Sequence, residues 1–248
     1  MKKILLFIMI AVGVSCKKQT QKGEIEEVKK ENFPKELGKV FEKHGGIDTW
    51  RKQNVLSFNL GEDAHTIDLH SRKTVINSPK YSLGFDGENI WVSDTTIYKK
   101  DPKFYYNLYF YFYAMPFVLA DDGIIYEKIP PITFQGTIYP GYKISYKSNV
   151  GISPDDNYFV YYNSETYQME WLGYTVTYFS KKPSTKTNLI KYNSWENVKG
   201  FLLPKAITWY KKDKDGNPTE PVKSATEFSL PLISQGKLPD SFFAKPTK

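Results

Sequence analysis

The sequence predicts a mainly β protein built on an antiparallel sheet with a few helices. Aromatic residues make up 16% of the 248 residues, with 19 Tyr, 16 Phe and 5 Trp, and such side chains favour the half-buried surface of a pleated sheet. After Gln53 apolar and polar residues alternate in short runs bounded by Gly, Asp, Asn and Pro, a pattern typical of antiparallel strands. No internal repeat or change of composition divides the chain after residue 32, so residues 33–248 are expected to form a single domain.

The first sixteen residues have the form of an export signal. Lys2 and Lys3 precede an apolar run over residues 4–14, which is followed by Ser15 and the chain's only cysteine, Cys16. The run is shorter than the roughly 20 apolar residues that a membrane-spanning helix needs. A cysteine directly after such a run resembles the bacterial lipoprotein signal, in which that residue becomes the diacylated N-terminus.

This resemblance implies a membrane anchor. We expect residues 1–15 to be a lipoprotein signal peptide and Cys16 to be lipidated. Residues 16–32 are almost free of apolar side chains and are expected to be a flexible tether. Gly13 stands where the signal usually carries a branched residue, so a soluble exported protein cut near Ser15 is the alternative.

The domain is expected to open with a helix and to continue as strands. A helix is predicted from Pro34 to His44, because Leu37, Val40 and Phe41 repeat at helical spacing and two glycines follow. A short helical turn is expected over residues 47–52. A first set of strands is expected over residues 55–60, 65–70, 73–77, 81–85, 90–93 and 96–99. A second set is expected over residues 133–139, 142–148, 157–163, 168–172, 175–181, 187–196, 205–211 and 222–229.

An aromatic segment over residues 101–121 separates the two sets of strands. Eight of the ten residues from Phe104 to Tyr113 are aromatic, and the β propensity of Tyr and Phe favours a strand. Asp101 followed by Pro102 favours a helix instead, with Asp as the N-cap and Pro in the first turn. We prefer the helix. Because such a helix is apolar around most of its circumference, it is expected to lie across the mouth or the concave face of the sheet.

The three histidines do not predict a metal site. His65 and His70 are five residues apart on an expected strand, so their side chains point to opposite faces. His44 stands at the end of a helix. Asp68 and His70 share a face, as a general-base pair would, but an alternating polar face on a solvated strand gives the same pattern.

No other motif in the sequence predicts catalysis. The pairs Asp121-Asp122 and Asp155-Asp156 are explained as turn residues at the ends of elements. The sequence has no Gly-x-Ser-x-Gly elbow, Gly-rich phosphate loop or His-Glu-x-x-His pattern. The net charge of +7 comes from basic residues spread over the chain, which favours solubility and attraction to anionic head groups over nucleic-acid binding. We expect a non-enzymatic protein with no metal, no cofactor and no nucleic-acid partner.

The aromatic residues leave two interpretations open. Residues 104–119 together with Trp91, Trp171, Trp195 and Trp209 would fill the solid core of an ordinary sandwich. In a strongly curved sheet the same side chains would line a concave apolar pocket, the usual form of a lipid or small-molecule site.

Several short motifs, taken in their order along the chain, resemble a family of uncharacterised Gram-negative lipoproteins over about residues 33–246. The motifs are His44-Gly45-Gly46-Ile47-Asp48-Thr49-Trp50, Phe85-Asp86-Gly87 with Trp91, residues 115–121, residues 139–142, residues 153–157, Gly200 with Leu203-Pro204, and Leu238-Pro239-Asp240. That family is similar in architecture to the lipoprotein carriers and receptors of the LolA and LolB kind. The resemblance implies an open antiparallel half-barrel lidded by helices, an apolar cavity that holds acyl chains, and no catalytic residue.

The anchor and the resemblance together predict an envelope lipoprotein that binds a lipid, an acyl chain or another hydrophobic ligand, with a role in lipid or lipoprotein trafficking. Its partner would be the membrane, reached through the lipid on Cys16, at the outer membrane facing the periplasm. A non-catalytic envelope scaffold with a filled core is the alternative, and no protein partner is identified. The residues expected to line the pocket are Trp91, Phe104, Tyr109, Phe112, Met115, Phe117 and Trp171.

Overall fold

The computed structural model describes residues 33–121, 123–146, 156–180 and 182–246. Cys16 and the expected signal peptide and tether lie outside these residues, as do Asp122 and Asp155. Residues Phe33–Lys248 form one compact unit. None of the helices in the described ranges has the length and apolar character that crossing a membrane requires.

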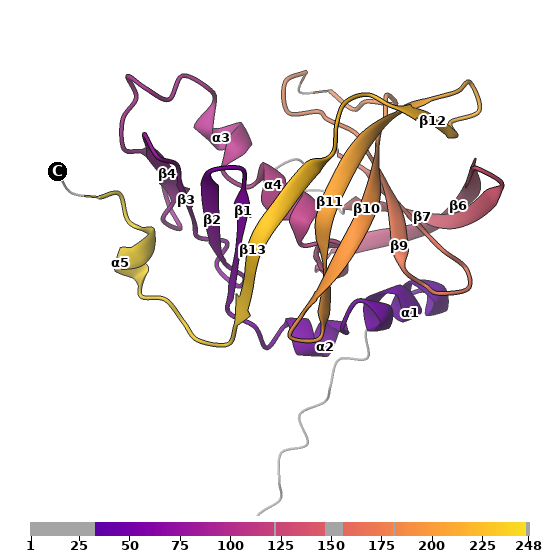
Figure 1. Cartoon of the computed structure of the whole chain (residues 1–248), viewed down its shortest axis with the longest axis horizontal. Helices are drawn as coiled ribbons and strands as arrows, with labels where there is room; N and C mark the ends of the chain where they lie inside the picture. The colour runs from indigo at the N-terminus through magenta and orange to yellow at the C-terminus, as the bar shows by residue number, and fades with distance from the viewer. Residues whose placement is uncertain (1–32, 122, 147–155, 181, 247–248) are drawn as a thin grey trace, which may run out of the picture. The chain divides into compact units, whose positions relative to one another are not determined.

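Within the described residues, thirteen strands form one antiparallel sheet that curves without closing (Figure 1). Twelve pair in the order β5-β4-β3-β2-β1-β13-β11-β10-β9-β8-β7-β6, and β12 pairs with β11. The predicted fold class, a mainly β protein with an open curved sheet, is therefore confirmed. The strands are β1 (Val55–Leu60), β2 (Asp63–Asp68), β3 (Thr74–Asn77), β4 (Ser82–Phe85), β5 (Ile90–Val92), β6 (Ile124–Phe134), β7 (Thr137–Tyr146), β8 (Tyr158–Tyr162), β9 (Met169–Tyr174), β10 (Asn188–Val198), β11 (Phe201–Lys212), β12 (Pro218–Pro221) and β13 (Thr226–Ser234).

The C-terminal strand joins two wings of this sheet. β1 to β5 follow one another as a first wing, and β6 to β11 form a second wing that also carries β12. β13 returns between the wings, where Val55 of β1 pairs with Ser234 and Ala206 of β11 pairs with Glu227. The sheet is thus more than the simple meander that the spacing of the strands indicates.

Short helices cover the concave side of the sheet, apart from α5, which packs on the convex side through Phe243. The helix expected within residues 101–121 is confirmed in pieces, because Asp101 accepts a hydrogen bond from the Lys103 amide at 2.9 Å and Pro102 begins the first turn. The helices are α1 (Lys35–Lys43), α2 (Ile47–Trp50), α3 (Pro102–Tyr105), α4 (Leu108–Tyr113), the 3-10 helix η1 (Phe117–Ala120) and α5 (Asp240–Phe243).

The main core lies between these helices and the concave face. Tyr113 of α4 stacks on Phe58 of β1 at 4.1 Å between ring centroids. Phe117 of η1 lies parallel to Trp50 of α2 at 4.2 Å. The Tyr192 hydroxyl of β10 donates to the Phe112 carbonyl at 2.8 Å. Contacts from both wings and from α2 therefore fix the aromatic segment across the concave face, as expected for a segment that is apolar around most of its circumference.

The end of α1 is locked to the second wing through His44. Its Nδ1 lies 3.3 Å from the Leu202 carbonyl, and its Nε2 accepts a hydrogen bond from the Met169 amide at 3.1 Å. Burial lowers the pKa of His44 to about 4, so the ring is neutral. Gly45 follows with φ +121°, and a Cβ there would lie 2.8 Å from the Gly200 carbonyl oxygen. This close approach explains why glycine occupies the corner.

Smaller apolar clusters cover the convex side. Trp171 packs with Phe134, Tyr139 and Tyr210 in one cluster. In the first wing, the Trp91 indole donates to the Phe243 carbonyl at 2.9 Å and so binds α5 to the sheet.

Three strand predictions are wrong because local turn chemistry prevails. Residues 96–99 form a turn in which the Thr96 amide donates to Asp94 at 2.7 Å. Residues 175–180, in a stretch expected as a strand to residue 181, form a loop whose Thr177 amide donates to Asp156 at 2.7 Å. The strand expected over residues 133–139 is interrupted by a two-residue turn, with φ +50° at Gln135 and +81° at Gly136.

Strand β6 is absent from the prediction because Pro130 and Pro131 interrupt its pattern. A proline cannot donate to the hydrogen-bond ladder and is confined to edges and bulges. Both conditions hold here, since β6 is an edge strand and its register with β7 shifts between Ile129 and Ile132. The last strand is also displaced: residues 226–234 pair with β1 and β11, whereas residues 222–229 were expected.

Candidate ligand-binding site

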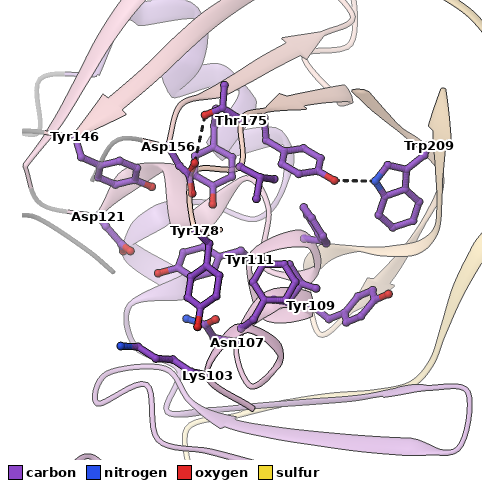
Figure 2. A pocket seen from close by; sticks show the side chains of 16 residues that line it. Lys103, Asn107, Tyr109, Tyr111, Asp121, Tyr146, Asp156, Thr175, Tyr178 and Trp209 are labelled. Atoms are coloured by element: carbon purple, nitrogen blue, oxygen red, sulfur yellow. Dashed lines mark hydrogen bonds between the residues drawn. The ribbon is translucent and has the colours of Figure 1, made fainter. Parts of the chain in front are cut away.

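A hollow of about 390 Å³ lies between the aromatic segment and the concave face of the second wing (Figure 2). Its volume falls within the range of roughly 300–1,000 Å³ that is usual for small-molecule sites. It is lined by Lys103, Phe104, Asn107, Leu108, Tyr109, Tyr111, Phe112, Asp121, Tyr146, Asp156, Tyr158, Tyr174, Thr175, Val176, Tyr178 and Trp209.

One wall of the hollow is made of aromatic rings that join α4 to the sheet. The Phe112 ring lies 5.2 Å from Tyr174 and 5.9 Å from Trp209, between centroids. The Trp209 indole donates to the Tyr174 hydroxyl at 2.9 Å (Figure 2). That hydrogen bond satisfies both polar atoms, so the wall offers mainly ring surface to a ligand.

A second part of the lining carries phenol groups. Tyr111, Tyr146 and Tyr158 lie with ring centroids 6.4–6.5 Å apart in two successive pairs. Burial raises the pKa of all three hydroxyls, so they are neutral at physiological pH. A ligand with an apolar body and a polar end would therefore find hydrogen-bonding groups here.

An ion pair lies beside these phenols. Arg72 donates to the Asp121 carboxylate at 2.9 Å, and its guanidinium lies 4.7 Å from the centre of the Phe110 ring. Arg51 donates to the Ala120 carbonyl at 2.9 Å. Both arginines therefore hold the C-terminal end of the aromatic segment in place over the first wing.

The opposite end of the segment meets the loop after β9. The Tyr178 hydroxyl donates to the Asp101 carboxylate at 2.7 Å. That bond lowers the pKa of Asp101 and joins the N-cap of α3 to the loop. The Phe104 ring lies 5.2 Å from Tyr178 and 4.9 Å from Phe179.

The seven residues expected to line a pocket lie in three different places. Phe104, Tyr109 and Phe112 line the hollow. Met115 and Phe117 are buried in the main core and do not line it, because α1 and α2 close that part of the concave face. Trp91 and Trp171 do not line it either, because their side chains pack in the clusters of the convex side.

Most of the residues that the strands contribute to the lining of the hollow, including Tyr146, Tyr158 and Tyr174, were not among the residues predicted from the sequence. Alternation within each strand was a usable signal for them. In β11, for example, Ile207 and Trp209 are two residues apart and share a face, and both face the main core. What the alternation does not supply is which of the two faces is concave.

The histidines and Asp68 have structural roles. His65 is buried and stacks on Phe58 at 4.8 Å, and burial lowers its pKa to about 4. β2 ends at Asp68, so His70 lies in the following turn and not on the strand as expected. The Asp68 carboxylate accepts from the His70 and Ser71 amides. Among the described residues, no three His, Cys, Asp or Glu side chains are grouped to hold a metal ion.

Comparisons with known proteins give a distant structural likeness. No protein-family model matches the chain, and no curated protein matches it. A LolA superfamily protein from Nitrosomonas europaea is 10% identical with a TM-score of 0.40, covering 83% of this chain and 96% of that chain. A putative outer membrane lipoprotein-sorting protein domain from Vibrio parahaemolyticus is 9% identical with a TM-score of 0.36, covering 82% and 97%. A DUF1329 family protein from Desulfovibrio piger is 10% identical with a TM-score of 0.42, covering 83% and 95%.

One of these structural neighbours is a LolA superfamily protein, and the lipoprotein family that the sequence motifs resemble is similar in architecture to the LolA and LolB kind. Because the identities and TM-scores are low, the hollow and its lining residues are the basis for a function.

Proposed function

We propose that this chain is a membrane-anchored envelope lipoprotein that binds a lipid, an acyl chain or another hydrophobic ligand in the hollow under α3 and α4. The observation that carries the proposal is a cavity of about 390 Å³ walled by Phe104, Leu108, Phe112 and Trp209 on the concave face of an open sheet. Burying an alkyl chain there contributes about 0.8 kcal/mol per methylene. Binding and release need no catalytic residue.

The lining favours an amphipathic ligand. Rings from α4, β9 and β11 would cover its apolar part, and the phenols of Tyr111, Tyr146 and Tyr158 would accept or donate hydrogen bonds at its polar end. The anchor on Cys16 would hold the protein at the envelope membrane from which such a ligand comes. Trafficking of lipids or lipoproteins is the role that this combination serves.

A non-catalytic scaffold is the second candidate, and a specific observation favours it. Most of the concave face is filled, since Met115, Phe117, Val118 and Leu119 are all at most 2% exposed. In that case the hollow would be a remnant of incomplete packing and the working surface would be polar.

The test is binding of a fluorescent fatty acid, cis-parinaric acid, to the full chain. Val176→Trp places a large ring in the hollow from the loop after β9, and Leu108→Gln removes apolar surface from α4 without adding bulk. We expect each change to weaken binding by about ten-fold or more, since a buried aliphatic side chain contributes roughly 1.5–3 kcal/mol.

The matched control is Ile138→Trp, at a side chain that is 59% exposed and does not line the hollow. It should bind the probe like the unchanged chain. Thermal unfolding of all variants separates loss of the site from loss of the fold. The carrier hypothesis would be rejected if the unchanged chain showed no saturable binding, or if the folded Val176→Trp variant bound the probe equally well. Either result would leave the scaffold hypothesis.

A further inference from the structure

Three aromatic side chains at the edge of the hollow form a small exposed cluster. The rings of Phe104, Tyr178 and Phe179 lie 4.9–5.2 Å apart in all three pairs. Phe179 is 69% exposed. We call these three residues the rim aromatics. Phe104 and Tyr178 also line the hollow, so the cluster is continuous with its apolar wall.

Hydrogen bonds hold the loop that carries Tyr178 and Phe179 in place. Tyr178 is fixed by its hydrogen bond to Asp101, and the Thr177 amide is bound to Asp156. Phe179 follows directly on this pinned stretch, with its ring against the outer side of Phe104 and Tyr178. A single exposed apolar side chain needs no explanation, but three rings in mutual tilted and edge-to-face contact at the mouth of an apolar hollow indicate a surface that meets something apolar.

Five exposed lysines lie close to the rim aromatics in the sequence, and one of them, Lys103, also lines the hollow. Lys99, Lys100 and Lys103 lie in and just before α3, and Lys182 and Lys186 lie after Phe179, all with exposed side chains. We call these five residues the rim lysines. Among the described residues of the stretches 95–103 and 175–187, Asp101 is the one acidic side chain. Asp121 and Asp156 also line the hollow, and Asp121 is paired with Arg72, so the positive excess belongs to the two stretches that hold the rim aromatics.

The residue types favour a bilayer over a protein as the occupant. Protein interfaces are enriched in Arg and depleted in Lys, whereas every rim cation is a lysine. Surfaces that lie on membranes combine apolar or aromatic side chains with Lys and Arg, and lysine stems extend along the apolar surface while the ammonium group stays among the head groups. An anionic lipid surface matches both the sign of the charge and the exposed rings.

We propose that the rim aromatics and the rim lysines form a docking surface for an anionic lipid bilayer, with the mouth of the hollow facing the membrane. This contact is separate from the anchor expected at Cys16. Its use for moving a ligand between bilayer and hollow rests on the proposed function, but the contact itself needs no ligand and is tested without one.

A local fluorescent reporter tests the contact in the full chain. Cys16 is the only cysteine, so Cys16→Ala with Ser180→Cys allows a single NBD label beside Phe179. We expect a blue shift and a gain of intensity with vesicles that mix phosphatidylcholine and phosphatidylglycerol, and little change with phosphatidylcholine alone. The matched label at Gln235→Cys, directly after the last residue of β13, should report no change, because β13 ends on the side of the sheet away from α3 (Figure 1).

Second changes in the Ser180-labelled chain separate the two components of the surface. Phe179→Ser should weaken partitioning into mixed vesicles by about ten-fold, because one exposed phenyl ring can no longer insert. Lys100→Gln with Lys182→Gln should weaken it by about thirty-fold, since each lysine near such a surface is worth roughly 1 kcal/mol. Ile138→Ser, which removes another exposed apolar side chain, should leave partitioning unchanged.

The proposal is overturned if no vesicle changes the label, if the Gln235 label responds equally, or if Phe179→Ser has no effect. Parinaric acid binding distinguishes this failure from failure of the proposed function. Phe179→Ser should bind the fatty acid normally because Phe179 does not line the hollow, while Val176→Trp should still dock on vesicles.

Discussion

The two halves of the aromatic segment are both rich in apolar residues but lie in different environments. In the C-terminal half, Tyr113, Met115 and Phe117 are at most 2% exposed and lie in the main core. In the N-terminal half, Phe104 and Tyr109 are only partly buried and line the hollow. The C-terminal half therefore fills the main core, and the N-terminal half forms one wall of a candidate site.

The difference arises from what lies opposite each half. η1 packs against α2, where Phe117 meets Trp50, and Arg51 and Arg72 bind its C-terminal end. The residues of α3 and Tyr106 after it pack on β4 and β5, and α3 meets the loop after β9 through the hydrogen bond between Asp101 and Tyr178. Composition alone therefore does not decide whether an aromatic run is core or pocket, because the partner surface does.

One truncation in each half tests whether the two halves are packed differently, and it should give the largest effect. Phe117→Ala removes a buried ring from a solid core, so the free energy of unfolding should fall by about 3–5 kcal/mol. Phe104→Ala removes a partly exposed ring and should cost no more than about 1 kcal/mol. The free energy of unfolding is measured by urea unfolding of both variants, with m-values that should equal that of the unchanged chain. Equal losses would mean that the two halves are packed alike.

The filled part of the core should also make stability depend on pH. Burial lowers the pKa of His44 and His65 to about 4, below the ordinary value near 6.5. Between these values the unfolded chain binds protons that the folded chain does not, so stability is full above pH 6.5 and falls as the pH decreases toward 4. Each histidine accounts for about 3 kcal/mol over this window.

His65→Phe sharpens this prediction, because it keeps a ring against Phe58 and removes the titrating group. We expect the pH dependence of the urea midpoint to fall by about half. The pKa of Glu170 is raised by burial and acts in the opposite direction, but equally in both chains. An unchanged pH dependence in the variant would show that His65 is not buried as a neutral ring.

The smallest expected effect concerns the bond that closes the open half. Asp101→Ala removes both the N-cap of α3 and the partner of Tyr178, and should lower stability by about 1 kcal/mol while speeding hydrogen exchange at the Lys103 amide. Asp101→Asn keeps an acceptor oxygen and is the matched control, with most of the stability retained. Equal exchange in the two variants would argue that the cap does not hold α3.

Much of the fold was predictable because its signals are local. Alternation within the strands and the Asp101-Pro102 helix start depend on neighbouring residues. The insertion of β13 between the wings was not predictable in this way, because Val55 and Ser234 pair across nearly the whole domain. Strand β6 was hidden by Pro130 and Pro131, which form a bulge that alternation does not describe.

The candidate site was predictable only in part, for a related reason. Tyr109 and Phe112 could be found from the composition of one segment. Trp91 and Trp171 could not be assigned correctly, because a strand presents two faces and the sequence does not say which face is concave. The rim lysines carried no signal of their own, since the two stretches that hold them are far apart in sequence.

The position of β13 has a consequence for the order in which the protein is made. β1 and β11 both leave an edge unpaired until residues 226–234 leave the ribosome, and pairing over such a long sequence separation is slow. Assembly of the whole sheet is therefore deferred until synthesis is nearly complete. A chain that stalls before its last strand would present two open strand edges to other chains, the kind of surface on which aggregation begins.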